Sequence, residues 1–149
     1  MFANYFNQHV LRASASPREY SYDADGNLLT NGVFSFSYDA DNRLSSVSSN
    51  GVAVAAFAYD AKSRRVRKAT PTDTHTYFYD DWNLVEERVA RTDGTASSNG
   101  TTRVCEYFWG PDLSGTEQGA GGVGGLLAAI HDGVPYFPCY DHNDNTAAA

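Results

Sequence analysis

The sequence contains few cysteines, few basic residues and no long apolar run. Its 149 residues include two cysteines and one methionine, with 11 Lys and Arg against 18 Asp and Glu, for a net charge of −7. No apolar stretch approaches the ~20 residues of a transmembrane helix, and Met1 to Arg18 lack the basic head and apolar run of a secretory signal. We therefore expect no membrane span.

The charge balance also argues against nucleic acid as a partner, because phosphate binding requires a positive surface. The one basic cluster lies within residues 62–68. No aromatic residue interrupts this cluster, and we interpret it as the solvated face of a return strand rather than a nucleic-acid patch.

The two cysteines do not form a metal-binding pair. Cys105 and Cys139 are separated by 33 residues, and the four histidines are scattered, whereas zinc sites combine cysteine or histidine ligands at short spacing. Two free thiols are the default interpretation, and a disulfide between them stays open. We expect no metal and no cofactor.

Three patterns superficially match functional motifs. The Asp-rich segments from Asp23 and Asp141 resemble calcium loops, but lack the Gly and Glu that an EF-hand requires at its sixth and twelfth positions. Gly119–Gly124 fits G-x-G-x-x-G, yet a polar segment precedes it and only five apolar residues, Leu126–Ile130, follow. Turn formation and close backbone passage explain these two patterns better. No serine lies in a G-x-S-x-G motif, and we expect no enzymatic activity.

The sequence is rich in aromatic residues, with 10 Tyr and 8 Phe, and these recur in a pattern. Six times, at intervals of 16 to 31 residues, an aromatic doublet is followed by a polar turn and an aliphatic pair. A period in this range indicates an array of small units that cannot bury their apolar faces alone. The intervals are counted between the second aromatic residues of the copies, which are Tyr22, Tyr38, Tyr59 and Tyr79, with Trp109 and Tyr140 in the weaker copies.

Each unit is predicted to be a β-hairpin. Tyr20 and Tyr22 are two residues apart, so both side chains lie on one face of a strand. Asp23–Gly26 carry turn-forming residues, and a period of two resumes on a return strand from Leu28. We expect positive φ at Gly26 and its equivalents, among which serine fits least well, and we expect the doublets of the first four units to be cross-strand neighbours on one face. The equivalents of Gly26 are Asn42, Ser63 and Asp144.

Composition along the chain predicts two blocks of repeats. We expect residues 1–19 to be a weakly structured leader and residues 20–89 to hold four hairpins. Residues 90–103 form a polar loop that we expect to be mobile, since nothing in it can pack. Residues 104–146 form a second block with a Gly-rich passage, and residues 147–149 are expected to be a disordered tail.

The Tyr-Asp-x-x-Gly-Asn/Arg-Leu units resemble the YD repeats of the RHS family, whose relatives include teneurins and insecticidal toxin-complex subunits. The later segments follow the order of that family too, with Trp109–Gly115, then Gln118–Leu127, then Tyr136–Asp141. The resemblance covers about residues 18–146. The repeat-defining residues are Tyr22, Asp23, Gly26, Tyr38, Asp39, Tyr59, Asp60, Tyr79, Asp80, Tyr140 and Asp141.

The resemblance implies an all-β fold in which antiparallel hairpin repeats form a curved or spiralling sheet, as a fragment of a YD-repeat shell. In the family such a shell encapsulates a C-terminal toxin or, in teneurins, contributes to adhesion, at the cell surface or outside the cell. We expect a structural role, with neighbouring repeats, other shell segments or an encapsulated toxin as partners. The resemblance ends near Asn145-Thr146, before the aspartyl self-cleavage motif of the family, so we expect no self-proteolysis.

A glycan-binding module is the alternative function, because Tyr and Trp rings can cover the apolar faces of sugars. Trp82 and Trp109 are the candidate stacking residues. Packing of both rings against neighbouring strands is the competing interpretation, since apolar or aromatic residues flank each of them.

Overall fold

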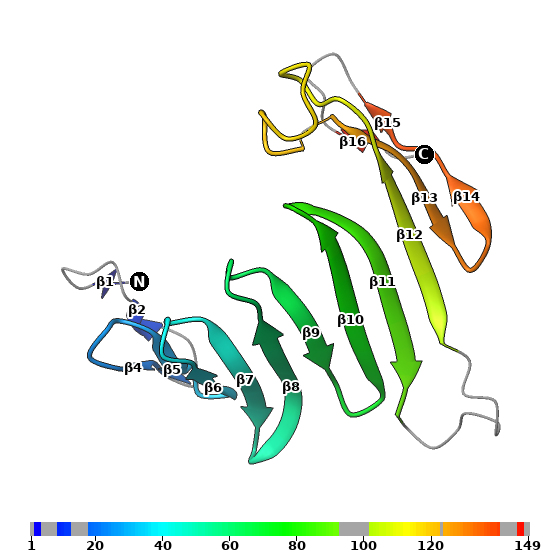
Figure 1. The fold of residues 1–149 in the computed structure, drawn as a ribbon. Coiled ribbons are helices and arrows are strands. Elements are labelled where there is room, and N and C mark those ends of the chain that lie inside the picture. Colours follow the sequence, from blue (N-terminus) through cyan, green and yellow to red (C-terminus); the bar gives the residue numbers. More distant parts are fainter. Residues whose placement is uncertain are drawn as a thin grey trace.

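The computed structural model is an open, curved β-sheet built from successive hairpins (Figure 1). Eleven strands form the main sheet, each antiparallel to the next, and their order in space follows their order in the chain. The expected all-β fold of antiparallel hairpins is confirmed. The structure describes residues 2–3, 9–12, 18–92, 102–122, 124–140 and 146–147.

The main sheet runs from β4 to β14, with these two strands at its edges in the described part of the chain. A three-stranded sheet precedes it, and a two-stranded sheet follows it. The small sheets comprise β1 (Phe2–Ala3), β2 (His9–Arg12) and β3 (Arg18–Glu19), and then β15 (Cys139–Tyr140) and β16 (Thr146–Ala147). The main sheet comprises β4 (Ser21–Tyr22), β5 (Leu28–Thr30), β6 (Phe34–Tyr38), β7 (Leu44–Ser49), β8 (Val52–Tyr59), β9 (Arg65–Ala69), β10 (Asp73–Asp80), β11 (Asn83–Arg91), β12 (Arg103–Trp109), β13 (Leu126–His131) and β14 (Val134–Tyr136).

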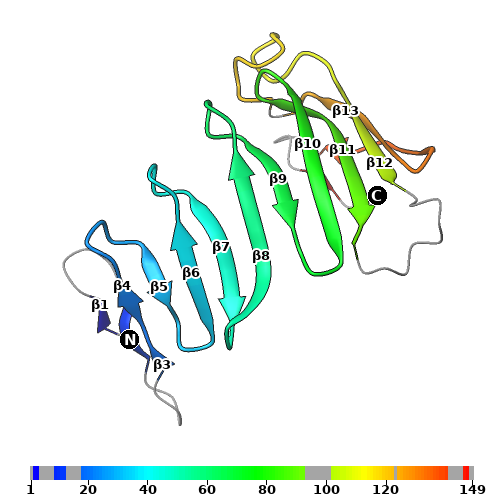
Figure 2. The same ribbon diagram turned by 60° about the horizontal axis from the view of Figure 1, so that its bottom comes forward.

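The four predicted reversals all lie at the same end of the strands, where Figure 2 shows them as a stepped row. Turns at the other end of the strands join one hairpin to the next. Asn50-Gly51, between β7 and β8, has the paired positive φ values, 51° and 76°, of a tight hairpin turn. The predicted reversals are Asp23–Asn27, Asp39–Arg43, Asp60–Arg64 and Asp80–Asn83.

The two predicted blocks of repeats share one sheet. β11 ends at Arg91 and β12 begins at Arg103, and the two strands pair directly. The expectations of a weakly structured leader (1–19), a mobile loop (90–103) and a disordered tail (147–149) stay predictions, because most of these residues lie outside the described ranges. The described part of the leader contains strands β1, β2 and β3.

The aromatic doublets of the repeats lie on one face of the sheet, but their predicted pairing as cross-strand neighbours was wrong. Phe57 is opposite Lys68 and Tyr77 is opposite Glu87, because a return strand separates each aromatic strand from the next. Among the described apolar side chains only two, Val89 and Ala129, are buried. The sheet is thus a single layer whose side chains are mostly half-buried. We call this side the tyrosine face; it carries Phe36, Tyr38, Phe57, Tyr59, Tyr77, Tyr79, Tyr107 and Trp109.

A one-residue β-bulge recurs in the hairpins. The register shifts between Ala58 and Tyr59, for example, so that Val66 is an extra residue on the return strand. Bulges bend a strand and increase its right-handed twist, and their repetition at one position curves the whole sheet. The extra residues are Leu29, Ser45, Val66, Val85 and Leu127.

Candidate functional site: the contacts between successive hairpins

One hydrogen bond recurs between each hairpin and the hairpin before it. Tyr59, the last aromatic residue of β8, donates its hydroxyl to the main-chain oxygen of Leu44 on the preceding return strand, at 2.9 Å. At Trp109 the indole Nε1–H replaces the hydroxyl and donates to Leu84 O at 2.7 Å. The remaining bonds are Tyr38 to Leu28 O (3.1 Å), Tyr79 to Arg65 O (3.0 Å) and Tyr140 to Leu126 O (2.7 Å).

The accepting carbonyl belongs in each case to the residue directly before the bulge. Leu44 precedes the bulged Ser45, and Leu84 precedes the bulged Val85. A bulge interrupts the ladder of main-chain hydrogen bonds, and a carbonyl removed from water requires a donor. The aromatic side chain supplies that donor, so it couples the bend of one hairpin to the next. Each such bond contributes about 0.5–1.5 kcal/mol.

The aspartate after each tyrosine closes its own turn. Asp39 Oδ1 accepts the amides of Asp41 (3.0 Å) and Arg43 (2.9 Å), and Asp39 Oδ2 accepts Arg43 Nε at 2.8 Å. Asp23 and Asp60 form the same contacts with the residues two and four positions further on.

These contacts lower the pKa of the turn aspartates. The side chain of Asn27, followed by main-chain amides, holds the pKa of Asp23 below its usual value. The main-chain amide and then the guanidinium of Arg43 do the same for Asp39. Loss of hydration alone would raise the pKa of Asp60, but hydrogen bonds from Arg64 and Lys62 outweigh it, so this pKa is also lowered. The charged carboxylate is therefore the form that the folded turn favours.

The fourth residue of each of the first three turns has the positive φ expected there. Gly26 has φ 89°, Asn42 has φ 59° and Ser63 has φ 62°. Ser63 adopts this strained conformation while its amide donates to Asp60 O at 3.0 Å and its hydroxyl accepts from Arg43 at 3.2 Å. Asp144, the remaining equivalent, lies outside the described residues.

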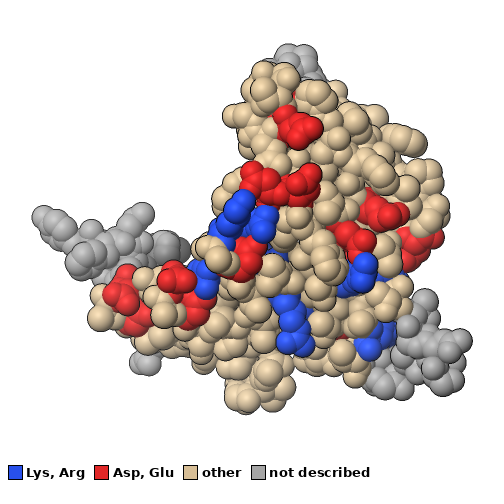
Figure 3. Space-filling view, viewed as in Figure 1, with Lys and Arg blue, Asp and Glu red and all other residues tan. Residues whose placement is uncertain are grey.

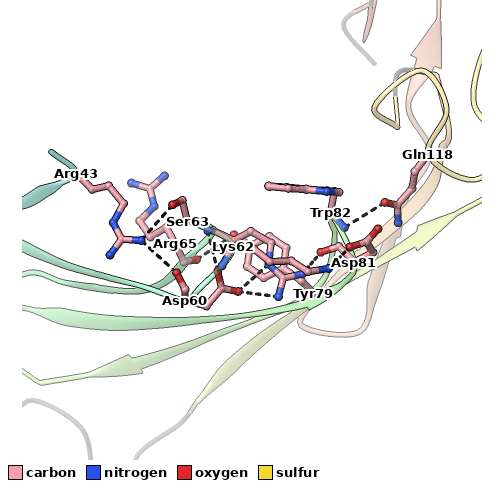
Figure 4. A network of polar contacts seen from close by, with 10 residues as sticks. Arg43, Asp60, Lys62, Ser63, Arg65, Tyr79, Asp81, Trp82 and Gln118 are labelled. Atoms are coloured by element: carbon pink, nitrogen blue, oxygen red, sulfur yellow. Dashed lines mark hydrogen bonds and ion pairs between the residues drawn. The ribbon is translucent and has the colours of Figure 1, made fainter. Parts of the chain in front are cut away.

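Neighbouring turns are joined to one another at this end of the strands (Figure 4). Arg43 Nη1 donates to the Asp60 carbonyl at 3.2 Å, and Arg64 Nη1 donates to the Asp81 carbonyl. The Gln118 side chain continues this series, accepting the Trp82 amide at 3.2 Å. We call this row of contacts between turns the turn ladder, and Figure 3 shows its acidic and basic side chains following one another from turn to turn.

Two arginines link the turn ladder to the tyrosine face. The Arg43 guanidinium lies over the Tyr59 ring, 5.0 Å from its centroid, and the Arg64 guanidinium lies 4.9 Å from the centroid of Tyr79. Each of these arginines contacts the aspartate of its own turn, the next turn and the next aromatic ring. Such cation–π contacts contribute about 0.5–1 kcal/mol at partly exposed sites.

The fourth turn is one residue shorter and lacks this arrangement. Asp80 pairs directly with Asn83 across the turn, and Asp81 takes the positive φ, 46°. The Asp80 carbonyl accepts Gln118 Nε2 at 3.1 Å. Asp80 therefore contributes its main chain to the turn ladder, although sequence alone made it equivalent to Asp60.

Sequence reasoning missed a fifth aspartate turn. Asp112 donates its amide to Thr116 O (2.7 Å), accepts the Gly115 amide at its carbonyl (2.8 Å) and accepts the Ser114 amide at Oδ1 (2.9 Å). This pattern matches Asp23–Asn27, but it starts three residues after Trp109 instead of immediately. The D-x-x-G spacing of Asp112 and Gly115 was the available signal. Asp112 is only 6% exposed, and the Ser114 hydroxyl, followed by main-chain amides, lowers its pKa.

The glycine-rich segment packs closely against the strands. Gly110 donates to Gly125 O at 2.7 Å, and a Cβ on Gly125 would lie 2.9 Å from the Gly110 oxygen. A Cβ on Gly122 would lie 2.9 Å from Asn83 Oδ1 and 3.4 Å from the Trp109 ring. The segment leads into strand β13. Glycine here permits contact between backbone segments and a ring.

The other candidate residues occupy separate positions. Trp82 is 58% exposed in the fourth turn, whereas Trp109 is half-buried and bonded to Leu84. Cys105 and Cys139 are free thiols. Tyr22 lies in β4 and Tyr140 in β15, while Asp141 lies outside the described residues.

Among the residues that the structure describes, no group of three or more His, Cys, Asp or Glu side chains is placed to hold a metal ion. No helix in that part of the chain is both long and apolar enough to cross a membrane.

An open sheet of hairpins, joined by repeated tyrosine and aspartate contacts, defines a YD-type β-repeat protein. The chain belongs to the teneurin YD-shell family, whose sequence model matches residues 6–88. This region is a structural repeat.

Curated relatives are similar to half or more of the chain. A protein of Bacillus spizizenii, named tRNA3(Ser)-specific nuclease WapA, is 30% identical over 127 residues, which is 83% of this chain and 5% of that protein. The tRNA nuclease WapA of Bacillus subtilis strain 168 is 33% identical over 81 residues, which is 52% of this chain and 4% of that protein. The chain thus spans about one-twentieth of the length of these relatives. None of these relatives is named for carbohydrate binding.

Proposed function

We propose that this chain is a non-enzymatic wall segment of a YD-repeat shell, of the kind that encapsulates and delivers a toxin or acts in adhesion at the cell surface. The supporting observation is the ring-to-carbonyl hydrogen bond, which recurs at five successive places. A bond of constant geometry between hairpins allows the same sheet to be extended by further repeats. Neighbouring YD repeats are the proposed partners, with an encapsulated toxin on one side of the wall.

The edges of the main sheet favour such extension. β4 and β14 are the edge strands, and the β14 side chains Val134 and Tyr136 are more than half exposed. Edge strands carry unpaired amide and carbonyl groups that recruit further strands, and repeat arrays require a neighbour or a cap at each end. The isolated chain should therefore self-associate through its edges.

Light scattering over a concentration series tests this proposal. We expect the mean mass to rise with concentration, and Val134→Lys to reduce the rise because a charge on an edge strand blocks pairing. Val52→Lys is the matched control, since Val52 is equally accessible (66% exposed, against 53% for Val134) but lies in β8, within the sheet. A monomer of constant mass throughout the series would contradict the wall proposal.

The relatives are named as tRNA nucleases, and we propose that this segment does not perform that reaction. The carboxylates of Asp23, Asp39, Asp60 and Asp112 each accept several hydrogen bonds within a turn or its loop, which leaves them engaged in the fold. Incubation of the purified chain with tRNA should leave the RNA intact. Cleavage that is lost in an Asp60→Asn variant would contradict the structural role.

A further inference from the structure

A cavity of about 200 Å³ lies between the fourth turn, strand β12 and the loop after it. Trp109 and the buried Asn83 line it, together with two acidic residues, Asp80 and Glu117. Val85, Tyr107 and Phe108 complete the lining.

The same place in the preceding hairpin is filled by an arginine. The bulged residues Val66 and Val85 are equivalent, which makes Arg64 the counterpart of Asn83 and Tyr79 the counterpart of Trp109. The Arg64 guanidinium lies over the Tyr79 ring at 4.9 Å and bonds the Asp60 carboxylate at 2.7 Å. Arg43 does the same with Tyr59 and Asp39 one hairpin earlier.

At the cavity two acidic residues are present, but Asn83 stands where the preceding hairpin has Arg64, so no guanidinium lies beside them. Neither Asp80 nor Glu117 forms an ion pair within the described residues. Asn83 is 7% exposed, and its side-chain amide forms no hydrogen bond with any residue that the structure describes. Two acidic residues and a tryptophan around one cavity offer the charge and the aromatic surface that a planar cation binds.

We propose that this cavity binds the guanidinium of an arginine side chain that belongs to a protein segment outside this chain. The chain has two arginines whose side chains are undescribed, Arg12 and Arg18, and both belong to the small sheet at the opposite end of the molecule from β12 (Figure 1). The guanidinium stacks on Trp109 and donates to Asp80 and Glu117, as Arg64 does with its own ring and aspartate. Arginine is preferred to lysine, because its planar fork bonds a carboxylate and stacks on a ring at once. This site does not depend on the wall role.

Titration with a blocked pentapeptide containing one arginine between glycines tests the site. The probe is followed through the two indole N–H signals in NMR, assigned with Trp82→Phe. The Trp109 signal should shift to saturation, and the isosteric citrulline peptide should bind at least about tenfold more weakly, because it lacks the charge. Equal binding of the two peptides, or no saturable shift, would overturn the proposal.

Variants locate the binding. Asp80→Asn and Glu117→Gln should each weaken arginine binding about tenfold, whereas Asp25→Asn, which alters an exposed turn carboxylate in the first hairpin, should leave it unchanged. Asn83→Arg should fill the cavity and abolish binding. If that variant does not fold, Glu117→Gln decides the matter, because Glu117 is exposed and its substitution leaves the packing intact. Unchanged affinity in both carboxylate variants would refute the site.

Discussion

The third and fourth hairpins solve the same packing problem with different residues. In the third, a five-residue turn ends in Arg64, whose guanidinium bonds Asp60, covers Tyr79 and reaches the next turn. In the fourth, a shorter turn ends in the buried Asn83, and Gln118, from the loop between β12 and β13, contacts the turn where an arginine would otherwise do so. The ring-to-carbonyl bond is nevertheless the same in both, at 3.0 Å and 2.7 Å.

The comparison shows which contact the architecture depends on. The turns vary in length, sequence and ion pairing, whereas the aromatic donor and the bulge before it recur in each of these hairpins. Contacts on the tyrosine face should therefore contribute more to stability than contacts in the turn ladder.

The largest effect is expected at the ring shared by the two hairpins. Tyr79→Ala removes the ring, its bond to Arg65 and the stacking of Arg64, and should lower the free energy of unfolding by about 2–4 kcal/mol. Phe78→Ala, on the opposite face and 40% exposed, should cost about 1 kcal/mol or less. Denaturant titration measures both, and equal losses would mean that the faces are misassigned. Tyr38→Ala and Ser37→Ala should differ in the same direction.

A smaller effect is expected in the loop that follows the fifth aspartate turn. Gly122→Ala places a Cβ 2.9 Å from Asn83 Oδ1, at φ 79°. Gly121→Ala has almost the same φ, 73°, but no atom lies within 4 Å of its Cβ. Strain at positive φ should cost both variants about 1 kcal/mol, and overpacking should cost Gly122→Ala about 1–3 kcal/mol more. Equal melting temperatures would show that the loop yields easily.

Acid should destabilise the aspartate turns. The folded state lowers the pKa of Asp23, Asp39, Asp60 and Asp112. Their stabilisation is complete above the unfolded pKa, about 3.9, and is lost as the pH falls through the lower folded values. Asp60→Asn removes one of these carboxylates and should flatten this dependence. Unfolding curves at a series of pH values below 5 compare the variant with the parent chain, and an unchanged dependence would contradict the role assigned to Asp60.

The smallest effect is expected from the arginine of the turn ladder. Arg64→Lys keeps the charge but loses the planar contact with Tyr79 and Asp60, and should cost about 0.5–1 kcal/mol. Arg67→Lys, on an exposed position of β9, should change stability by less than about 0.5 kcal/mol. Equal values for the two, measured in denaturant at low salt, would remove Arg64 from the comparison.

Local chemistry predicted most of the fold. The Asp-x-Asp-Gly-Asn pattern at residue 23 and the alternation around it are local signals, and the hairpins formed where these signals lay. Ser63 shows the limit of such rules, because it adopts φ 62° with support from Arg43, which is 20 residues away.

The contacts between hairpins could not be predicted, since they depend on strand register. A bulge such as Val66 changes which carbonyl faces the next ring, and no composition rule places it. The pairing of aromatic residues across strands was wrong for the same reason, as a return strand intervenes. Asp112 was missed because its turn is displaced from Trp109. The cavity at Asn83 could not be predicted because residues far apart in the sequence, from 80 to 117, line it.

The ring-to-carbonyl bond has a consequence for how such genes can change. Its acceptor is a main-chain oxygen, contributed by leucine in four cases and by arginine in one. Because no side chain has to match the incoming ring, a hairpin copied or exchanged between genes can join the array without a compensating substitution in its new neighbour. Duplication and recombination of whole units should then be tolerated far more often than insertions inside a unit, which would displace the bulge from its donor.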